Sequence, residues 1–93
     1  NYAEDIHHVF WRVKGASRLR GRSLAVLREL AAWRETESRK RNLPRRRMLQ
    51  DESLVEIARR DHLDIEIMAR MRGLTKGLLR RFGDEIMMAW QRG

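Results

Sequence analysis

The apolar residues of this chain recur at intervals of three and four positions, which is the spacing that places them on one face of an α-helix. The two clearest runs are Ile6, Val9, Phe10 and Val13, and Leu24, Leu27, Leu30 and Ala31. No stretch alternates apolar and polar residues over four or more positions with the β-branched enrichment of a strand. The pattern therefore predicts an all-α fold.

Helix-capping residues and glycines divide this pattern into segments. The expected helices cover residues 5–15, 23–42, 51–60, 64–73, 75–83 and 84 onward. Beyond Trp33 the second of these has no apolar face, but Glu35 with Arg39 and Glu37 with Arg41 form i, i+4 pairs in the favourable order. The expected N-caps are Asp5, Asp51, Asp64, Thr75 and Asp84. Gly83 is expected to separate the last two helices. Residues 16–22 are interpreted as a basic connector and residues 43–50 as a loop, because neither has a sustained apolar period.

The size and composition of the chain allow one domain with one core, since it has 93 residues of which 42% are hydrophobic. Cysteine is absent, which excludes disulfides and thiolate metal sites and fits a cytoplasmic protein. No run of apolar residues reaches the length of a membrane span. Because the chain starts on Asn1 instead of methionine, we expect it to be part of a longer protein.

Positive charge is concentrated in the first half of the chain. The net charge is +8, and residues 12–47 hold 13 basic and 3 acidic side chains. A local excess of this kind favours a polyanionic partner such as RNA, DNA or an anionic membrane surface. We expect RNA or another single-stranded nucleic acid, no membrane, and a monomeric domain.

The candidate binding residues surround the expected end of the long helix. They are Arg22, Arg34, Arg39, Lys40, Arg41, Arg45, Arg46 and Arg47, and Arg12, Lys14, Arg18 and Arg20 extend them if the connector folds back. Several guanidinium groups on a bent segment can contact successive phosphates. The alternative is a solvated charge run. Trp33 is interpreted as a core residue with its ring edge near the surface, and base stacking is the alternative.

No residues form a recognisable catalytic or metal site. Asp64 and Glu66 have the spacing of a metal-binding D-x-E pair, but they stand where a helix starts, so they are interpreted as a cap and a first-turn charge. His7, His8 and His62 lack the spacing of a zinc site. No nucleophile elbow, Walker or Rossmann pattern is present.

Several segments in a fixed order resemble the HRDC domain, the helicase and ribonuclease D C-terminal module. The matching segments are LAVLRELAAWRE (Leu24 to Glu35), NLP (Asn42 to Pro44), D-x-x-L-x-x-I-A (Asp51 to Ala58), M-x-G-L (Met71 to Leu74) and RRFGDEI (Arg80 to Ile86). The preceding WRVKGASRL (Trp11 to Leu19) is more similar to ribonuclease D than to RecQ-type helicases.

This resemblance implies a SAM-like orthogonal bundle of five to six helices. Residues 23–93 would form the HRDC domain, and residues 1–22 would be an N-terminal helix and basic connector from a preceding domain. The domain would help bring RNA to a linked exonuclease domain, whose Mg- or Mn-dependent chemistry removes nucleotides 3′ to 5′ from structured RNA such as transfer RNA precursors. No cofactor is expected in this segment itself.

Three alternatives stay open. The domain could dock on the catalytic domain or a partner protein through its first helix and its Met-rich end, which holds Met68, Met71, Met87 and Met88. It could also be the DNA-binding HRDC domain of a RecQ-type helicase. The turn from Met71 to Thr75 is also similar to a helix-hairpin-helix, whose backbone N–H groups bind phosphate. Here Thr75 stands in place of the second glycine of that motif.

Overall fold

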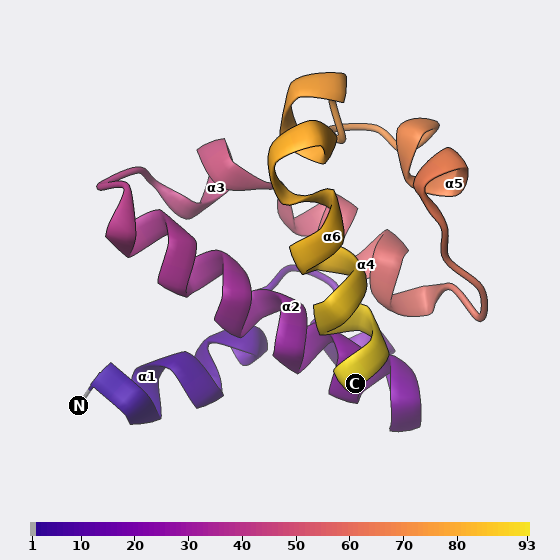
Figure 1. Ribbon diagram of the computed structural model, residues 1–93. Coiled ribbons are helices and arrows are strands. Elements are labelled where there is room, and N and C mark those ends of the chain that lie inside the picture. Colours follow the sequence, from indigo (N-terminus) through magenta and orange to yellow (C-terminus); the bar gives the residue numbers. More distant parts are fainter. Residues whose placement is uncertain (1) are drawn as a thin grey trace.

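Helix α2 (Gly21–Lys40) runs through the middle of the molecule, and the other elements pack around it (Figure 1). The computed structural model describes residues 2–93, with side chains from Asp5 onward. The other elements in chain order, where η marks a 3-10 helix, are α1 (Tyr2–His8), η1 (Val9–Arg12), η2 (Ala16–Arg18), α3 (Arg45–Met48), α4 (Asp51–Arg59), α5 (Ile65–Ala69) and α6 (Lys76–Arg92). Within this part of the chain there is no strand, and the predicted all-α bundle is confirmed.

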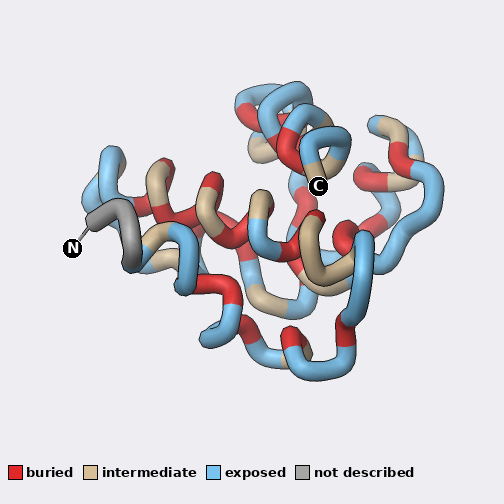
Figure 2. The backbone as a smooth tube through the Cα atoms, turned by 90° about the horizontal axis from the view of Figure 1, so that it is seen from below, coloured by how far each residue is buried: buried red, intermediate tan, exposed pale blue. Residues whose placement is uncertain are grey.

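The core forms where α4, α6 and the N-terminal elements meet α2. Leu27 and Leu30 of α2 are fully buried, and so are Ile57 of α4 and Ile86 of α6. Figure 2 shows these buried segments in the interior, with exposed residues on the outer sides of the helices. Each such side chain contributes about 1.5–3 kcal/mol through its removal from water. The N-terminal elements belong to the same core, to which they contribute Val9, Phe10, Val13, Ala16 and Leu19.

Helix α6 runs back along α2 in the opposite sense. Near its beginning the ring of Phe82 packs edge-on against Trp33, with 5.5 Å between the ring centroids. At its other end Gly93 lies against the backbone of Val26, near the start of α2. The beginning of α6 therefore lies on the same side of the molecule as the end of α2.

Two of the predicted N-caps are confirmed by their hydrogen bonds. The Asp64 carboxylate accepts a hydrogen bond from the backbone N–H of Ile67 at 2.8 Å, and the Thr75 hydroxyl accepts one from Leu78 at 3.1 Å. These caps satisfy donors that the first turn of a helix leaves unpaired.

The other three predicted N-caps are wrong. Asp5 lies inside α1 and Asp84 inside α6, while Asp51 is the first residue of α4 and Gln50 occupies the cap position. The Asp51 carboxylate instead binds the backbone N–H of Lys14 and the guanidinium group of Arg34, which explains why it does not cap α4.

The predicted break at Gly83 is also wrong, because α6 continues through this residue. Gly83 is buried, and a Cβ atom added to it would lie 3.2 Å from Cδ1 of Ile65. The missing side chain gives α5 room to pack on α6. Here packing between helices outweighs the low helix propensity of glycine, which costs about 1 kcal/mol relative to alanine.

The expected loop at residues 43–50 contains the short helix α3, and the expected connector at residues 16–22 contains η2. Helix α2 begins at Gly21 and ends at Lys40, two residues earlier at each end than expected. None of the described helices is long and apolar enough to cross a membrane.

Candidate nucleic-acid interface

Arg34 is a buried side chain, although the sequence placed it among the candidate binding residues. It is 2% exposed, and its Nη1 atom donates a hydrogen bond to the carbonyl oxygen of Leu49 at 2.7 Å and lies 2.8 Å from Oδ1 of Asp51. Burial lowers the pKa of Arg34, and the hydrogen bond to Asp51 opposes this change. Arg34 therefore holds the α2–α4 contact together and is removed from the candidate surface.

Asp51 joins three parts of the chain. Besides pairing with Arg34, its Oδ2 atom accepts a hydrogen bond from the backbone N–H of Lys14 at 3.1 Å. Burial raises the pKa of Asp51, but the hydrogen bonds from Lys14 and Arg34 outweigh burial and hold the pKa below its ordinary value. The carboxylate thus stays ionised, and it ties the segment before α2 to the start of α4.

Two carboxylates at the end of α2 neutralise part of the predicted cluster. Glu35 lies 2.8 Å from Nε of Arg39 and 3.3 Å from Nη2 of Arg45. Both carboxylates are largely buried, with Glu35 6% and Glu37 7% exposed. Because burial reduces screening by solvent, these pairs are held more firmly than exposed ones.

Glu37 forms ion pairs with the basic residues at the very end of the helix. Its carboxylate lies 3.3 Å from Nε of Arg41 and 3.8 Å from Nζ of Lys40. The sequence spacing of Glu37 and Arg41 predicted such a pair, and the structure confirms it. Four of the predicted cations therefore share two carboxylates.

Arg46 and Arg47 differ from these four. Both are exposed on α3 and form no ion pair within the part of the chain that the structure describes. Arg46 also lines a groove of about 820 Å³ between η1, α2 and α3, to which Arg12 and Lys14 contribute further positive charge. The predicted patch is therefore smaller than expected, but it remains positive.

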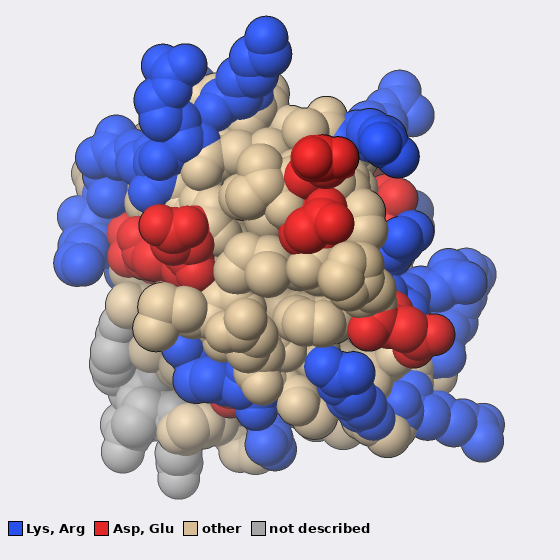
Figure 3. Space-filling model, turned by 45° about the vertical axis from the view of Figure 1, so that its right-hand side comes forward, with Lys and Arg blue, Asp and Glu red and all other residues tan. Residues whose placement is uncertain are grey.

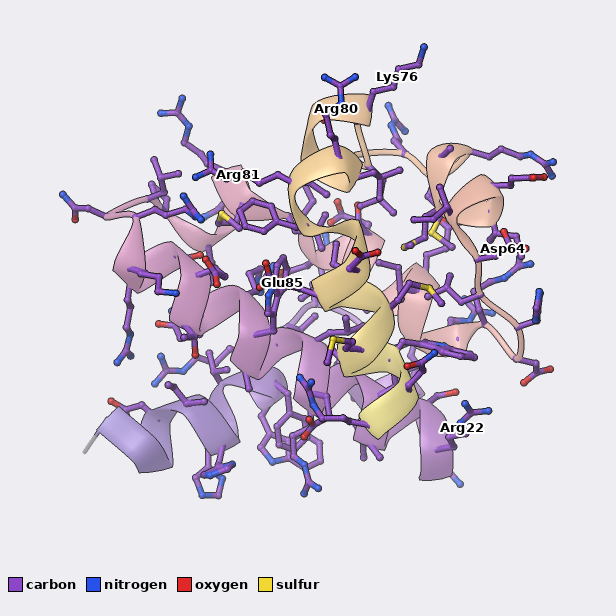
Figure 4. All side chains as sticks on the ribbon, in the orientation of Figure 1. Arg22, Asp64, Lys76, Arg80, Arg81 and Glu85 are labelled. Carbon is purple, nitrogen blue, oxygen red and sulfur yellow. The ribbon has the colours of Figure 1, made fainter. Side chains whose placement is uncertain are left out.

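Arg22 lies apart from the other candidates. Its guanidinium group stacks over the ring of Trp90, with Cζ 4.8 Å from the centroid. Figure 4 shows Arg22 at the end of the molecule opposite to the beginning of α6. Since an α-helix rises 1.5 Å per residue, about 27 Å of helix separates Arg22 from Lys40 at the end of α2.

Three basic residues at the beginning of α6 were not among the binding residues predicted from the sequence. Lys76, Arg80 and Arg81 are exposed and form no ion pair within the described residues. Figure 4 shows Lys76 and Arg80 pointing outward from the first turns of α6, and Arg81 pointing toward α3. Residues 48–93 hold 8 basic and 8 acidic side chains, so their summed charge gave no signal of this local excess.

Trp33 is part of the core, as expected. It is 9% exposed, and its Nε1 atom donates a hydrogen bond to Oε1 of Glu85 at 3.0 Å. Its ring packs against Phe82. This position leaves no free ring face for stacking on a base, so Trp33 is removed as a stacking candidate.

The turn between α5 and α6 packs inward against α4. Gly73 has a φ of +86°, and a Cβ atom added to it would lie 2.6 Å from Oγ of Ser53. The same hydroxyl donates a hydrogen bond to the carbonyl oxygen of Arg72 at 2.7 Å. The left-handed backbone and the close contact with Ser53 therefore both favour glycine at position 73.

The acidic pair at the start of α5 has a structural role. The hydrogen bond from Ile67 is the largest cause that lowers the pKa of Asp64, as expected for a carboxylate that caps a helix. No group of three or more His, Asp or Glu residues in the described part of the chain is arranged to hold a metal ion.

Comparison with known proteins decides the family. The sequence profile of the HRDC domain matches residues 23–89, which is more than half of the chain. The chain belongs to the HRDC domain family. No solved structure matches this HRDC domain significantly.

The curated relatives of this HRDC domain carry the name Ribonuclease D. The protein from Gluconacetobacter diazotrophicus is 50% identical over 56 residues, which cover 60% of this chain and 14% of that protein. The protein from Nitrobacter hamburgensis is 42% identical over 73 residues, which cover 77% of this chain and 19% of that protein. The one from Desulfotalea psychrophila is 36% identical over 81 residues, 87% of this chain and 21% of that protein. The HRDC domain thus spans about a fifth or less of the length of these relatives.

Proposed function

We propose that this HRDC domain binds RNA and serves a linked exonuclease domain of the ribonuclease D type in the cytoplasm. The linked domain would carry out 3′ to 5′ removal of nucleotides, as in transfer RNA processing, with Mg or Mn held by its own residues. The HRDC domain would contribute affinity and positioning. The relatives named Ribonuclease D support this association.

The observation that carries the proposal is the positive charge left at the end of α2 and on α3 after ion pairing. Of the six basic residues from Arg39 to Arg47, four pair with Glu35 or Glu37 at this end of the molecule, and Arg39 also lies 4.0 Å from Asp5. Arg46 and Arg47 take no part in these pairs and are exposed. Guanidinium groups in this state can form charge-assisted hydrogen bonds with phosphate oxygens and displace the counterions of the strand.

The proposal is tested by a double variant, Arg46→Gln with Arg47→Gln, in a titration of a labelled single-stranded RNA at several salt concentrations. Each phosphate contact contributes about 0.7 to the slope of log K against log salt for single strands, so the slope should fall by about 1.4. A matched control replaces Arg28 and Arg59 by glutamine, since both are exposed, lie outside the candidate surface and form no ion pair within the described residues. If wild-type protein shows no salt-dependent binding, the proposal is wrong.

A docking function has one observation in its favour. Trp11 is 58% exposed and Met88 is 56% exposed, and aromatic and methionine side chains are enriched at protein interfaces. Of the other methionines at the Met-rich end, Met68 and Met71 are buried in the core and Met87 is half-buried. Titrating the separate exonuclease domain onto Trp11→Ala and Met88→Ala variants tests this second function, and unchanged affinity in both would exclude these contacts.

A further inference from the structure

We propose that the bound strand continues from α3 onto the first turns of α6, where Lys76, Arg80 and Arg81 contact its phosphates. This inference rests on the proposed function, because it extends the same interface. The three residues are named the α6 cations below. Their ligand is the phosphodiester backbone of a nucleic-acid strand.

Lys76 and Arg80 share one side of α6, Arg81 points from the same turns toward α3, and none of the three forms an ion pair within the described residues. Lys76 and Arg80 are four residues apart, which places them one above the other on a helix. Asp84 and Glu85 follow one turn later, but neither forms an ion pair within the described residues, and Glu85 accepts the hydrogen bond from Trp33. The positive charge of the first turns is therefore exposed and unneutralised.

The ring of Phe82 joins the α6 cations to the end of α2. The guanidinium carbon of Arg41 lies 4.9 Å from the centroid of this ring, and that of Arg81 lies 5.4 Å from it. Two like charges from different helices thus converge on one aromatic ring. A strand that crosses this ring would meet both guanidinium groups, and because Arg41 is also paired with Glu37 at 3.3 Å, Arg81 supplies the unpaired charge at this point.

The space-filling view supports a continuous surface. Figure 3 shows Lys and Arg side chains gathered along the upper left of this face, over the beginning of α6. The apolar residues beside the α6 cations, Leu78, Leu79 and Phe82, are buried or half-buried, so the patch offers no exposed aromatic ring for base stacking. Such a surface fits the backbone of a strand and is expected to bind with little sequence preference.

The test replaces the three α6 cations together by glutamine and measures binding of RNA and DNA strands of equal length and sequence across a salt series. The slope of log K against log salt should fall by about 2 for both strands, because three contacts of about 0.7 each are lost. A control variant, with glutamine at Arg28, Arg59 and Arg60, removes the same charge from exposed positions on α2 and at the end of α4, none of which belongs to the candidate surface. Its slope should match that of the wild-type protein.

The outcomes separate this inference from the proposed function. If the Arg46 and Arg47 variant lowers the slope but the α6 variant does not, the strand does not reach α6 and the inference is overturned while the proposed function stands. An equal fall in the control variant would show a general effect of net charge and would also overturn it. Absence of binding by the wild-type domain overturns both. Circular dichroism and thermal melting should show all variants folded, since the replaced side chains are exposed.

Discussion

The end of α2 and the beginning of α6 both carry a cluster of basic residues, but the two clusters differ in how far carboxylates neutralise them. At the end of α2, Glu35 and Glu37 hold four cations in ion pairs, and Arg34 is buried against Asp51. At the beginning of α6, three cations have no such partner in the described structure. The density of positive charge in a sequence therefore does not locate a binding surface, because what matters is which charges the fold leaves unpaired.

The largest effect is expected from Arg34→Met, because it removes one partner of a buried ion pair. Asp51 and the carbonyl oxygen of Leu49 would lose their donor, which should lower the free energy of unfolding by about 3 kcal/mol. Arg46→Met is the matched control, since Arg46 is exposed, and it should change stability by less than about 0.5 kcal/mol. Urea denaturation measures both. Equal stability of the two variants would contradict the distinction between structural and surface arginines.

The same ion pair should make stability depend on pH. The lowered pKa of Asp51 means that the folded protein binds fewer protons than the unfolded chain in acid, so the stabilisation is present above about pH 4 and is lost as the pH falls through the lowered pKa. Asp51→Asn should be less stable than wild type at pH 7, and this difference should shrink below pH 4. Urea denaturation from pH 7 to pH 2 tests this, with Asp61→Asn at an exposed position as control. A difference that is constant with pH would be inconsistent with an ionised Asp51.

A smaller effect, on the salt dependence of RNA binding, should follow from Glu37→Gln, because this change leaves two cations at the end of α2 without their carboxylate. Lys40 and Arg41 lose their carboxylate, so the slope of log K against log salt for RNA binding should rise by up to about 1.4. Glu56→Gln is a suitable control, since Glu56 is exposed and forms no ion pair within the described residues. An unchanged slope in the Glu37 variant would mean that the strand does not pass over the end of α2.

Features that depend on neighbours in sequence were predicted well. The caps at Asp64 and Thr75 each reach an N–H group three residues ahead, so the local pattern was enough to find them. The pairs of Glu35 with Arg39 and Glu37 with Arg41 were also visible as helical spacings. The spacings predicted that these pairs stabilise the helix. They did not predict that the same pairs neutralise part of the expected binding cluster.

Features that depend on distant contacts were missed. Arg34 meets a carbonyl oxygen 15 residues away, and nothing in its neighbourhood distinguishes it from exposed arginines of the same helix. Gly83 stays helical because Ile65 packs against it, a contact that no local pattern contains. The cluster on α6 was hidden for a related reason, since the acids that balance it in the sequence do not pair with it in space.

The burial of Arg34 also provides a natural reporter of local opening. Its Nη1 atom is held by Leu49 and Asp51, whereas the guanidinium groups of Arg46 and Arg47 are exposed to water. Hydrogens on a buried and bonded guanidinium exchange with solvent only when the surrounding structure opens. In nuclear magnetic resonance spectra, we therefore expect separate and slowly exchanging Arg34 guanidinium signals, whose exchange rate measures how often α2 and α4 come apart.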